Sequence, residues 1–177
     1  MSCNALMAAI LTEAARLRQM RAMCRHTLTD ADPEDADARA CLAAYYAELA
    51  RLFDTGFDVG RSRDLEARDM RPPRGAFLIA RGTEGAAAGC VGLKGTGGPE
   101  AEIKRLWVAP GARGAGLARA LMAAAEDRAR DMGITVLRLD TNRVLTGAIA
   151  LYRATGWSEI PAYNDEPYAH HWFEKRL

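Results

Sequence analysis

The stretch WVAPGARGAGLARALMAAAE, residues 107–126, joins the end of a strand to a long helix through a glycine-rich loop. Leu117 and Leu121 begin an apolar stripe at helical spacing, and Gly133 ends the helix. The following run ITVLRLDT, residues 134–141, is rich in apolar and β-branched residues, which is typical of a strand buried within a sheet. A helix that connects two strands of one sheet allows them to run parallel. We therefore expect a parallel strand–helix–strand unit at the centre of the fold.

The remaining patterns predict an α+β domain with one mixed sheet of six or seven strands and helices on both faces. Further strands are expected at residues 76–80, 88–94, 101–108, 157–160 and 170–177. Further helices are expected at residues 6–25, from Pro33 to about Phe53 with Asp32 as N-cap, near Leu65, and from Thr146 as N-cap to just before Gly156. Alternation along 101–108 separates Ile103, Arg105 and Trp107 on one face from Glu102, Lys104, Leu106 and Val108 on the other.

Composition limits the class of protein. The 177 residues are about one domain's length, and a net charge of +1 argues neither for nor against a polyanionic partner. The chain has 4 cysteines without C-x-x-C spacing, which indicates free thiols in a reducing cytoplasm, with a disulfide pair as the alternative. No apolar run reaches the length of a membrane span, and the N-terminus lacks a signal-peptide pattern. We expect a cytoplasmic protein that does not contact a membrane.

The glycine loop before the long helix suits an anionic group. A helix N-terminus exposes unpaired N–H groups at the positive end of its dipole, and Gly114 and Gly116 let a ligand approach the backbone. Arg113 adds a cation. A P-loop is excluded because Leu117 stands where its lysine is required, and Arg119 replaces the third glycine of a dinucleotide fingerprint. The alternative is a glycine-rich connection that only allows close helix–strand packing.

One further pattern fits the loop. Arg113, Gly116 and Ala118 match R-x-x-G-x-[GA] after a strand, and with this loop the chain resembles the GNAT superfamily of acyl-CoA-dependent N-acetyltransferases. The segments GCVGLK, EIKRLWV, LRLDTNRVLTGAIALYRATGW and YNDEPYAHHWFEKRL resemble consecutive GNAT segments in the expected order. The resemblance implies a GNAT-like domain over residues 27–177, preceded by an N-terminal helical extension at residues 1–26.

The resemblance also implies acetyl-CoA as co-substrate and names the main-chain groups that would bind it. The pyrophosphate would lie on the loop, at Arg113, Gly114, Ala115, Gly116, Leu117 and Ala118. The pantetheine and the thioester would meet N–H groups of the preceding strand, at Leu106, Trp107 and Val108. Asn142 is a further candidate, but the family's frequent asparagine corresponds to Leu145 here, which puts that contact in doubt.

Two side chains are candidates for proton transfer in the reaction that the resemblance implies. Tyr152, in ALYRATGW, would protonate the departing thiolate, because a phenol stays protonated at neutral pH. Glu102 would deprotonate the amine, directly or through water. The alternatives are a tyrosine that only packs in the core, since Ala148, Ile149 and Tyr152 lie at helical spacing, and a glutamate that only pairs with a neighbouring cation.

The acceptor is expected to be a primary amine of a small molecule or a peptide, acetylated directly in a ternary complex. Asp165 and Glu166 lie where GNAT folds shape the acceptor pocket and could attract a cationic amine, or could belong to a solvated turn. His170 and His171 point to opposite faces of a strand, so we expect no metal site. We expect no nucleic-acid partner, and a homodimer stays open. The alternative function is a catalytically silent acyl-CoA sensor or scaffold.

Overall fold

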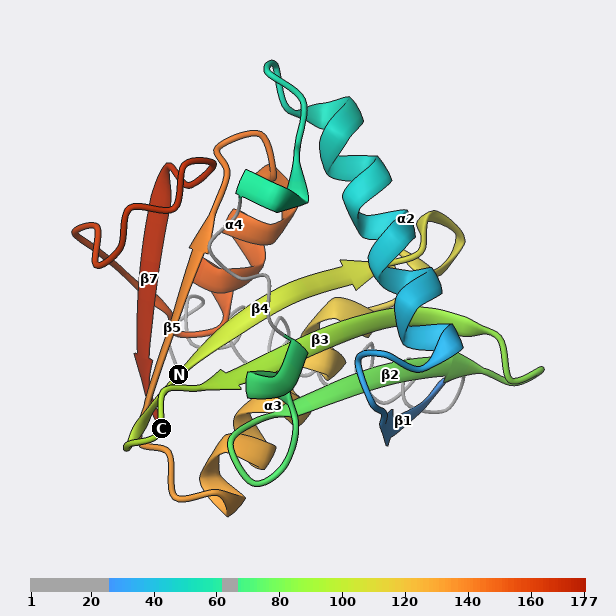
Figure 1. Cartoon of the computed structure of the whole chain (residues 1–177), viewed down its shortest axis with the longest axis horizontal. Coiled ribbons are helices and arrows are strands. Elements are labelled where there is room, and N and C mark those ends of the chain that lie inside the picture. Colours follow the sequence, from blue (N-terminus) through green and yellow to red (C-terminus); the bar gives the residue numbers. More distant parts are fainter. Residues whose placement is uncertain (1–25, 62–66) are drawn as a thin grey trace, which may run out of the picture.

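The computed structural model describes residues 26–61 and 67–177, whose strands form one mixed sheet (Figure 1). The strand order is β1-β2-β3-β4-β5-β7-β6, and only the β4–β5 pair is parallel. The strands are β1 His26–Asp30, β2 Ala76–Gly82, β3 Ala87–Gly95, β4 Glu100–Val108, β5 Val136–Thr141, β6 Ser158–Ile160 and β7 His171–Arg176. The predicted parallel unit is confirmed as β4–α3–β5, whereas β1 is a strand that the sequence patterns did not predict.

Helices cover both faces of the sheet, as predicted. They are α2 Ala36–Leu52, α3 Leu117–Asp131 and α4 Thr146–Ala154, with short 3-10 turns η1 Val59–Arg61, η2 Ala67–Met70 and η3 Pro110–Ala112. Helix α2 lies in front of the sheet in Figure 1, and α3 lies behind it. Two apolar cores result: Ala38 and Cys41 of α2 pack with Phe77 and Ile79 of β2, whereas Leu121 belongs to the core behind the sheet.

Strand β5 lies between β4 and β7, but it is not apolar on both sides as predicted. Leu137 and Leu139 are buried in the core that contains α3, whereas the alternate residues Arg138 and Asp140 face the α2 side and are only partly buried. Both polar residues are paired, Arg138 with Glu174 and Asp140 with Lys104. The strand therefore uses one face for the core and the other for polar contacts.

A β-bulge in β4 overturns the predicted alternation of its side chains. The register with β3 shifts between Cys90 and Gly92, which pair with Trp107 and Lys104. Arg105, which lies between these two partners, has a φ of 56°, which is uncommon for a residue with a side chain. Ile103 and Val108 consequently lie in the same core, while Trp107 packs against the core on the α2 side. The prediction that Ile103 and Trp107 share a face is wrong, because the bulge adds one residue to the strand.

Two predicted helix caps also change. Helix α2 begins at Ala36 with Asp35 as its N-cap, because the Asp32 carboxylate instead accepts bonds from the Glu34 N–H at 2.8 Å and from Arg71 Nε at 2.8 Å. Helix α4 has Leu145 as N-cap and Thr146 as its first residue. The helices expected at residues 6–25 and near Leu65 lie outside the described residues, so the boundary near residue 26 stays a prediction.

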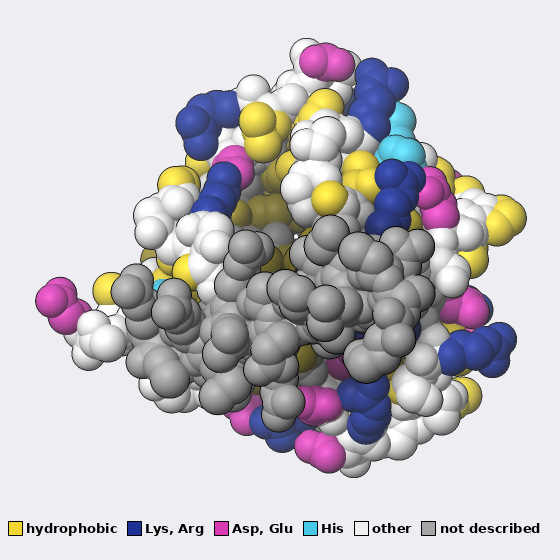
Figure 2. Space-filling view, turned by 180° about the vertical axis from the view of Figure 1, so that it is seen from behind, with side chains coloured by type: hydrophobic (Ala, Val, Ile, Leu, Met, Phe, Trp, Pro, Cys, Tyr) yellow, Lys and Arg dark blue, Asp and Glu magenta, His cyan; other side chains and the backbone are white. Residues whose placement is uncertain are grey.

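The described surface and thiols bear on the expected environment. Cys41 and Cys90 are free and buried, and the other two cysteines lie outside the described residues. In the described part of the chain, no helix has the length and apolar character needed to cross a membrane. Figure 2 shows the side behind the sheet, where basic and acidic side chains are interspersed around the described surface. The cytoplasmic location stays a prediction.

Candidate active site

The centre of the site is the gap where β4 and β5 separate. The two strands pair only from Glu100 to Glu102, and beyond that point β4 stays with β3 and β5 stays with β7. The Ala109 N–H donates to Ala88 of β3 at 2.9 Å, so the alternation of the ladder turns the N–H and C=O of Val108 toward the gap. The gap therefore leaves the Val108 N–H available to a ligand that enters it, whereas the Val108 C=O accepts a bond from Arg113.

A large cavity of about 550 Å³ opens beside this gap. It lies between α2, the end of β4, the glycine loop and the start of α4. Eight of the nine predicted acetyl-CoA residues line it, namely Leu106, Trp107, Val108, Arg113, Gly114, Gly116, Leu117 and Ala118. Ala115 is not among the residues that line it.

The glycine loop leaves the N-terminus of α3 open to the large cavity. Gly114 and Gly116 have φ values of 78° and 91°, and Gly116 is the N-cap of α3. Glycine is needed there because side chains rarely tolerate positive φ. The N-cap offers no side-chain hydrogen bond, so the first N–H groups of the 15-residue helix stay available to an anion.

Arg113, the cation that the sequence adds to this loop, is paired with a carboxylate of α2. Its Nη2 lies 2.6 Å and 2.7 Å from the two carboxylate oxygens of Glu48 on α2, and its Nε donates to Val108 O at 2.9 Å. Glu48 also accepts a 2.9 Å bond from Trp107 Nε1. Burial acts to raise the pKa of Glu48, but the bonds from Arg113 and Trp107 outweigh it and lower that pKa. This cluster ties α2 to the loop along the lining of the cavity.

A second cation, which sequence reasoning did not assign to binding, lines the same cavity. Arg119 lies in the first turn of α3, and among the described residues its side chain makes no recorded hydrogen bond or ion pair. An arginine three positions after a helix N-cap can reach an anion held there. The large cavity thus combines the open N–H groups of the helix with two arginines, Arg113, which is paired with Glu48, and Arg119.

A small cavity of about 100 Å³ continues from the large one on the other side of the gap. The two cavities share five lining residues, Tyr45, Leu49, Leu106, Leu145 and Ala148. Tyr152 lines the small cavity from α4, and its ring packs against Trp157 and Phe173 at centroid distances of 6.1 Å and 5.6 Å. Burial, with the Asp140 charge as a second cause, raises the pKa of Tyr152, so its hydroxyl stays protonated. Both roles considered for this residue fit its position.

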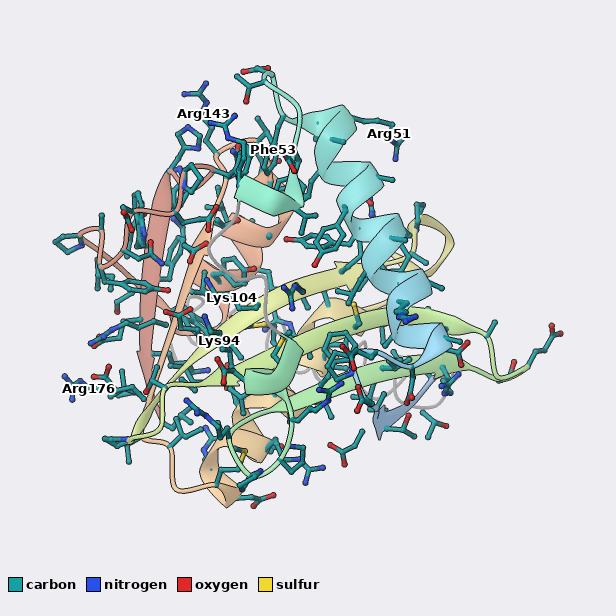
Figure 3. The ribbon with its side chains drawn as sticks, viewed as in Figure 1. Arg51, Phe53, Lys94, Lys104, Arg143 and Arg176 are labelled. Carbon is teal, nitrogen blue, oxygen red and sulfur yellow. The ribbon has the colours of Figure 1, made fainter. Side chains whose placement is uncertain are left out.

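Glu102 lies apart from both cavities. Its carboxylate pairs with Lys104 Nζ at 3.1 Å, and Lys104 in turn pairs with Asp140 at 2.6 Å. Lys104 and Asp140 line the small cavity, whereas Glu102 lines neither. Figure 3 shows Lys104 in front of the sheet, near the place where β4 and β5 separate. Glu102 does not share a face with Leu106 and Val108, because the bulge intervenes; its role as a base stays a prediction.

The predicted acceptor residues separate in the structure. Glu166 is buried and lines the small cavity, whereas Asp165 is exposed and lines neither cavity. Asn142 holds the loop before β7, since its Nδ2 donates to Tyr168 O at 2.8 Å and its Oδ1 accepts the Val144 N–H at 3.1 Å. Asn142 thus has a local structural role, which is an alternative to the contact with the co-substrate that the sequence put in doubt.

The adjacent His170 and His171 have different surroundings. His171 pairs with Glu159 at 2.6 Å, and His170 is exposed. Within the described ranges, no group of three or more His, Cys, Asp and Glu side chains could hold a metal ion. Sequence reasoning missed the α2 side of the site, although the adjacent Tyr45 and Tyr46 on a predicted amphipathic helix were a usable signal.

Comparisons with known proteins agree with this architecture. The model of the acetyltransferase (GNAT) family matches residues 42–157. An uncharacterized N-acetyltransferase of Schizosaccharomyces pombe is 32% identical over 136 residues, which cover 76% of this chain and 83% of that protein. The fold matches that of a Klebsiella pneumoniae protein assigned to the acyl-CoA N-acyltransferases, with a TM-score of 0.67, 29% identity and coverage of 86% and 97% of the two chains.

A more distant structure contains ligands. N-acetylglutamate synthase from Neisseria gonorrhoeae, in complex with coenzyme A and N-acetyl-glutamate, has a TM-score of 0.61 at 23% identity, and the match covers 85% of this chain and 35% of that one. At this identity the likeness concerns the fold. The family match and the S. pombe relative carry the assignment: the chain belongs to the GNAT family of acetyltransferases and is an acyltransferase enzyme.

Proposed function

We propose that this enzyme transfers the acetyl group of acetyl-CoA directly to a primary amine within a ternary complex. The observation that carries the proposal is the pair of cavities that meet at the β4–β5 gap and share five residues. One cavity presents amides and an arginine suited to a pyrophosphate, and the other contains candidate proton-transfer groups. Direct transfer needs two substrates to meet at one point, and this arrangement provides that point.

The residues that would hold acetyl-CoA fit its chemistry. The first amides of α3, together with Arg119, suit the pyrophosphate, and the Val108 N–H suits the thioester oxygen as negative charge develops on it. When acetyl-CoA binds, the Arg113 guanidinium would leave the Glu48 carboxylate and pair with a phosphate group. Acetyl-CoA supplies the activated acyl group as a thioester.

The proton transfers are assigned to groups beside the gap. As the C–N bond forms and the C–S bond breaks, one proton must leave the amine and one must reach the departing sulfur. Tyr152 is the proposed donor to the sulfur, because its hydroxyl is protonated and lines the small cavity. Glu102 remains the proposed base, acting through water, since its carboxylate pairs with Lys104, which lines the small cavity. Asp140 is the second candidate base, because it lines the cavity itself.

The test measures thiol release from acetyl-CoA with and without a panel of amines, with mass spectrometry of the products. Amine-dependent thiol release with stoichiometric N-acetyl product is expected. Tight acetyl-CoA binding without turnover of any amine would instead support a silent sensor. Glu102→Gln and Asp140→Asn are then compared with the active amine. The variant that lacks the true base should be slower than wild type at neutral pH. This difference should shrink as rising pH deprotonates the free amine. Equal pH profiles for both variants and wild type would refute both bases.

A further inference from the structure

The small cavity is lined by an unusual share of the chain's aromatic rings. The chain has nine tyrosines and phenylalanines, and six of them line this cavity. Five of the six form a continuous cluster, which we call the aromatic wall: Tyr45, Tyr46, Phe53, Phe57 and Tyr168. Phe57 is its centre, with ring centroids 5.7 Å from Tyr46, 5.8 Å from Phe53 and 4.8 Å from Tyr168. These distances are typical of favourable ring contacts.

The aromatic wall does not belong to either apolar core. None of its five rings is a member of the two core clusters, and Tyr45, Tyr46, Phe57 and Tyr168 remain partly exposed. Core aromatic residues such as Phe77 and Phe173 are, by contrast, almost fully buried. The partly exposed rings therefore present apolar surface to the small cavity, where a ligand can bury it.

Contacts between distant segments hold the aromatic wall in place. The rings come from α2, from the loop that follows it, and from the loop before β7. The Asp58 N–H donates to the Tyr168 hydroxyl at 3.0 Å, and the Arg61 guanidinium lies 6.0 Å from the centre of the Tyr168 ring. Phe53 lies at the C-terminal end of α2, beside this loop (Figure 3). A surface held by such contacts loses little freedom when a rigid ligand binds.

The end of the small cavity nearer the gap is polar and adjoins the reacting groups. Asp140 lines it, held by Lys104 at 2.6 Å and by Asn164 Nδ2 at 3.0 Å. Tyr152 and the shared residue Leu106 lie on the same cavity lining. The Asp140 carboxylate would attract an ammonium group, and the shared lining leads from there to the large cavity. An acceptor that stacks on the aromatic wall can thus direct its amine toward the gap.

We propose that the acceptor is a primary amine that carries an aromatic ring, with the ring on the aromatic wall and the amine at the gap. This inference rests on the proposed acetyl transfer and names the acceptor class of that same site. An amine without an aromatic ring would gain less from the aromatic wall, because it offers no π face for ring–ring contact. A flat aromatic ring gains both apolar burial and ring–ring contact there.

The test compares amines that differ in the ring. The probes are 2-phenylethylamine, 2-cyclohexylethylamine and n-butylamine, assayed as kcat/KM at saturating acetyl-CoA. We expect 2-phenylethylamine to exceed n-butylamine by about 10- to 100-fold, the range for filling an apolar pocket. It should also exceed the cyclohexyl analogue, which has the same carbon count without a π face. Phe57→Leu should reduce the preference for the phenyl compound at least about threefold, because it removes the ring that contacts three others.

Tyr163→Leu is the matched control. It also removes a partly buried ring, but one that lines neither cavity, so the ratio between phenyl and butyl substrates should stay within about twofold of wild type. Equal or better turnover of n-butylamine, or an equal rate with the cyclohexyl compound, would overturn the aromatic class and leave acetyl transfer standing. No turnover of 2-phenylethylamine by enzyme that binds acetyl-CoA would also overturn the aromatic acceptor class. Absence of acetyl-CoA binding by calorimetry would overturn the proposed function itself.

Discussion

Replacing Tyr152 by Phe removes one hydroxyl from the lining of the small cavity and leaves the ring in place. The ring contacts with Trp157 and Phe173 remain. Within the described ranges the hydroxyl makes no recorded hydrogen bond, so its removal leaves no buried partner unsatisfied. We therefore expect the free energy of unfolding to change by less than about 1 kcal/mol, measured by urea denaturation.

The kinetic effect should be much larger than the effect on stability. General acid catalysis contributes about 10²-fold or more, which corresponds to about 2.7 kcal/mol on the barrier. Because burial raises the pKa of Tyr152, the acid stays protonated, and wild-type rates should not fall on its account until the pH exceeds about 10. We expect single-turnover acetyl transfer to slow about 10²-fold in Tyr152→Phe at every pH from about 6 to 9.

Single-turnover measurement is needed because product release can hide a slower chemical step. The matched control is Tyr163→Phe, which also removes a tyrosine hydroxyl near Asp140 and keeps the ring. Its 3.5 Å contact with Asp140 is long, and Lys104 and Asn164 still hold that carboxylate at 2.6 Å and 3.0 Å. Its rate should stay within about threefold of wild type. Equal single-turnover rates for wild type and Tyr152→Phe would show that Tyr152 only packs in the core and that the thiolate leaves without it.

Two further predictions concern the binding of acetyl-CoA, measured by calorimetry. Gly114→Val should weaken binding at least about 10-fold, because Gly114 lines the large cavity and a valine would take up space where the co-substrate is proposed to bind. The control Gly133→Val should change affinity less than about twofold. The two variants carry similar strain, about 1–3 kcal/mol, because the two glycines have φ values of 78° and 75° and a Cβ at either would meet no atom within 4 Å. A similar loss of affinity in both variants would contradict the loop assignment. Glu48→Gln should tighten binding about two- to fivefold, because an ion pair of partly exposed groups contributes up to about 1 kcal/mol and its loss releases Arg113, while the amide oxygen still accepts from Trp107. Weaker binding by Glu48→Gln would mean that Arg113 acts only by tying α2 to the loop.

The difference between local and long-range information is clearest along β4. Periodicity located this strand to within one residue, because apolar and charged residues alternate along its first half and apolar residues end it. The faces of its side chains could not be predicted, since alternation assumes that each residue advances the strand by one position. The bulge at Arg105 breaks that count, and it is visible only in the pairing with β3. Glu102 and Trp107 were misplaced for this one reason.

The glycine loop is the part of the site that the sequence by itself determined. A strand, a run with Gly114 and Gly116, and a helix are encoded by neighbouring residues, so they could be read without tertiary contacts. The resemblance of this loop and of the segment around Tyr152 to one family is local in the same sense. The order of helices and strands also predicted the parallel β4–β5 pair, because a connecting helix leaves few other arrangements.

Only the tertiary structure decided what surrounds that loop. Glu48 neutralises Arg113 although the two are 65 positions apart, and Tyr168 joins the aromatic wall through a bond to Asp58 across 110 positions. No periodicity or short motif connects residues at such separations, because their contact depends on how α2 and the loop before β7 pack at the β4–β5 gap. The chain's own patterns therefore identify the family and its loop, whereas the pairing of Arg113 and the shape of the small cavity arise from packing between distant segments.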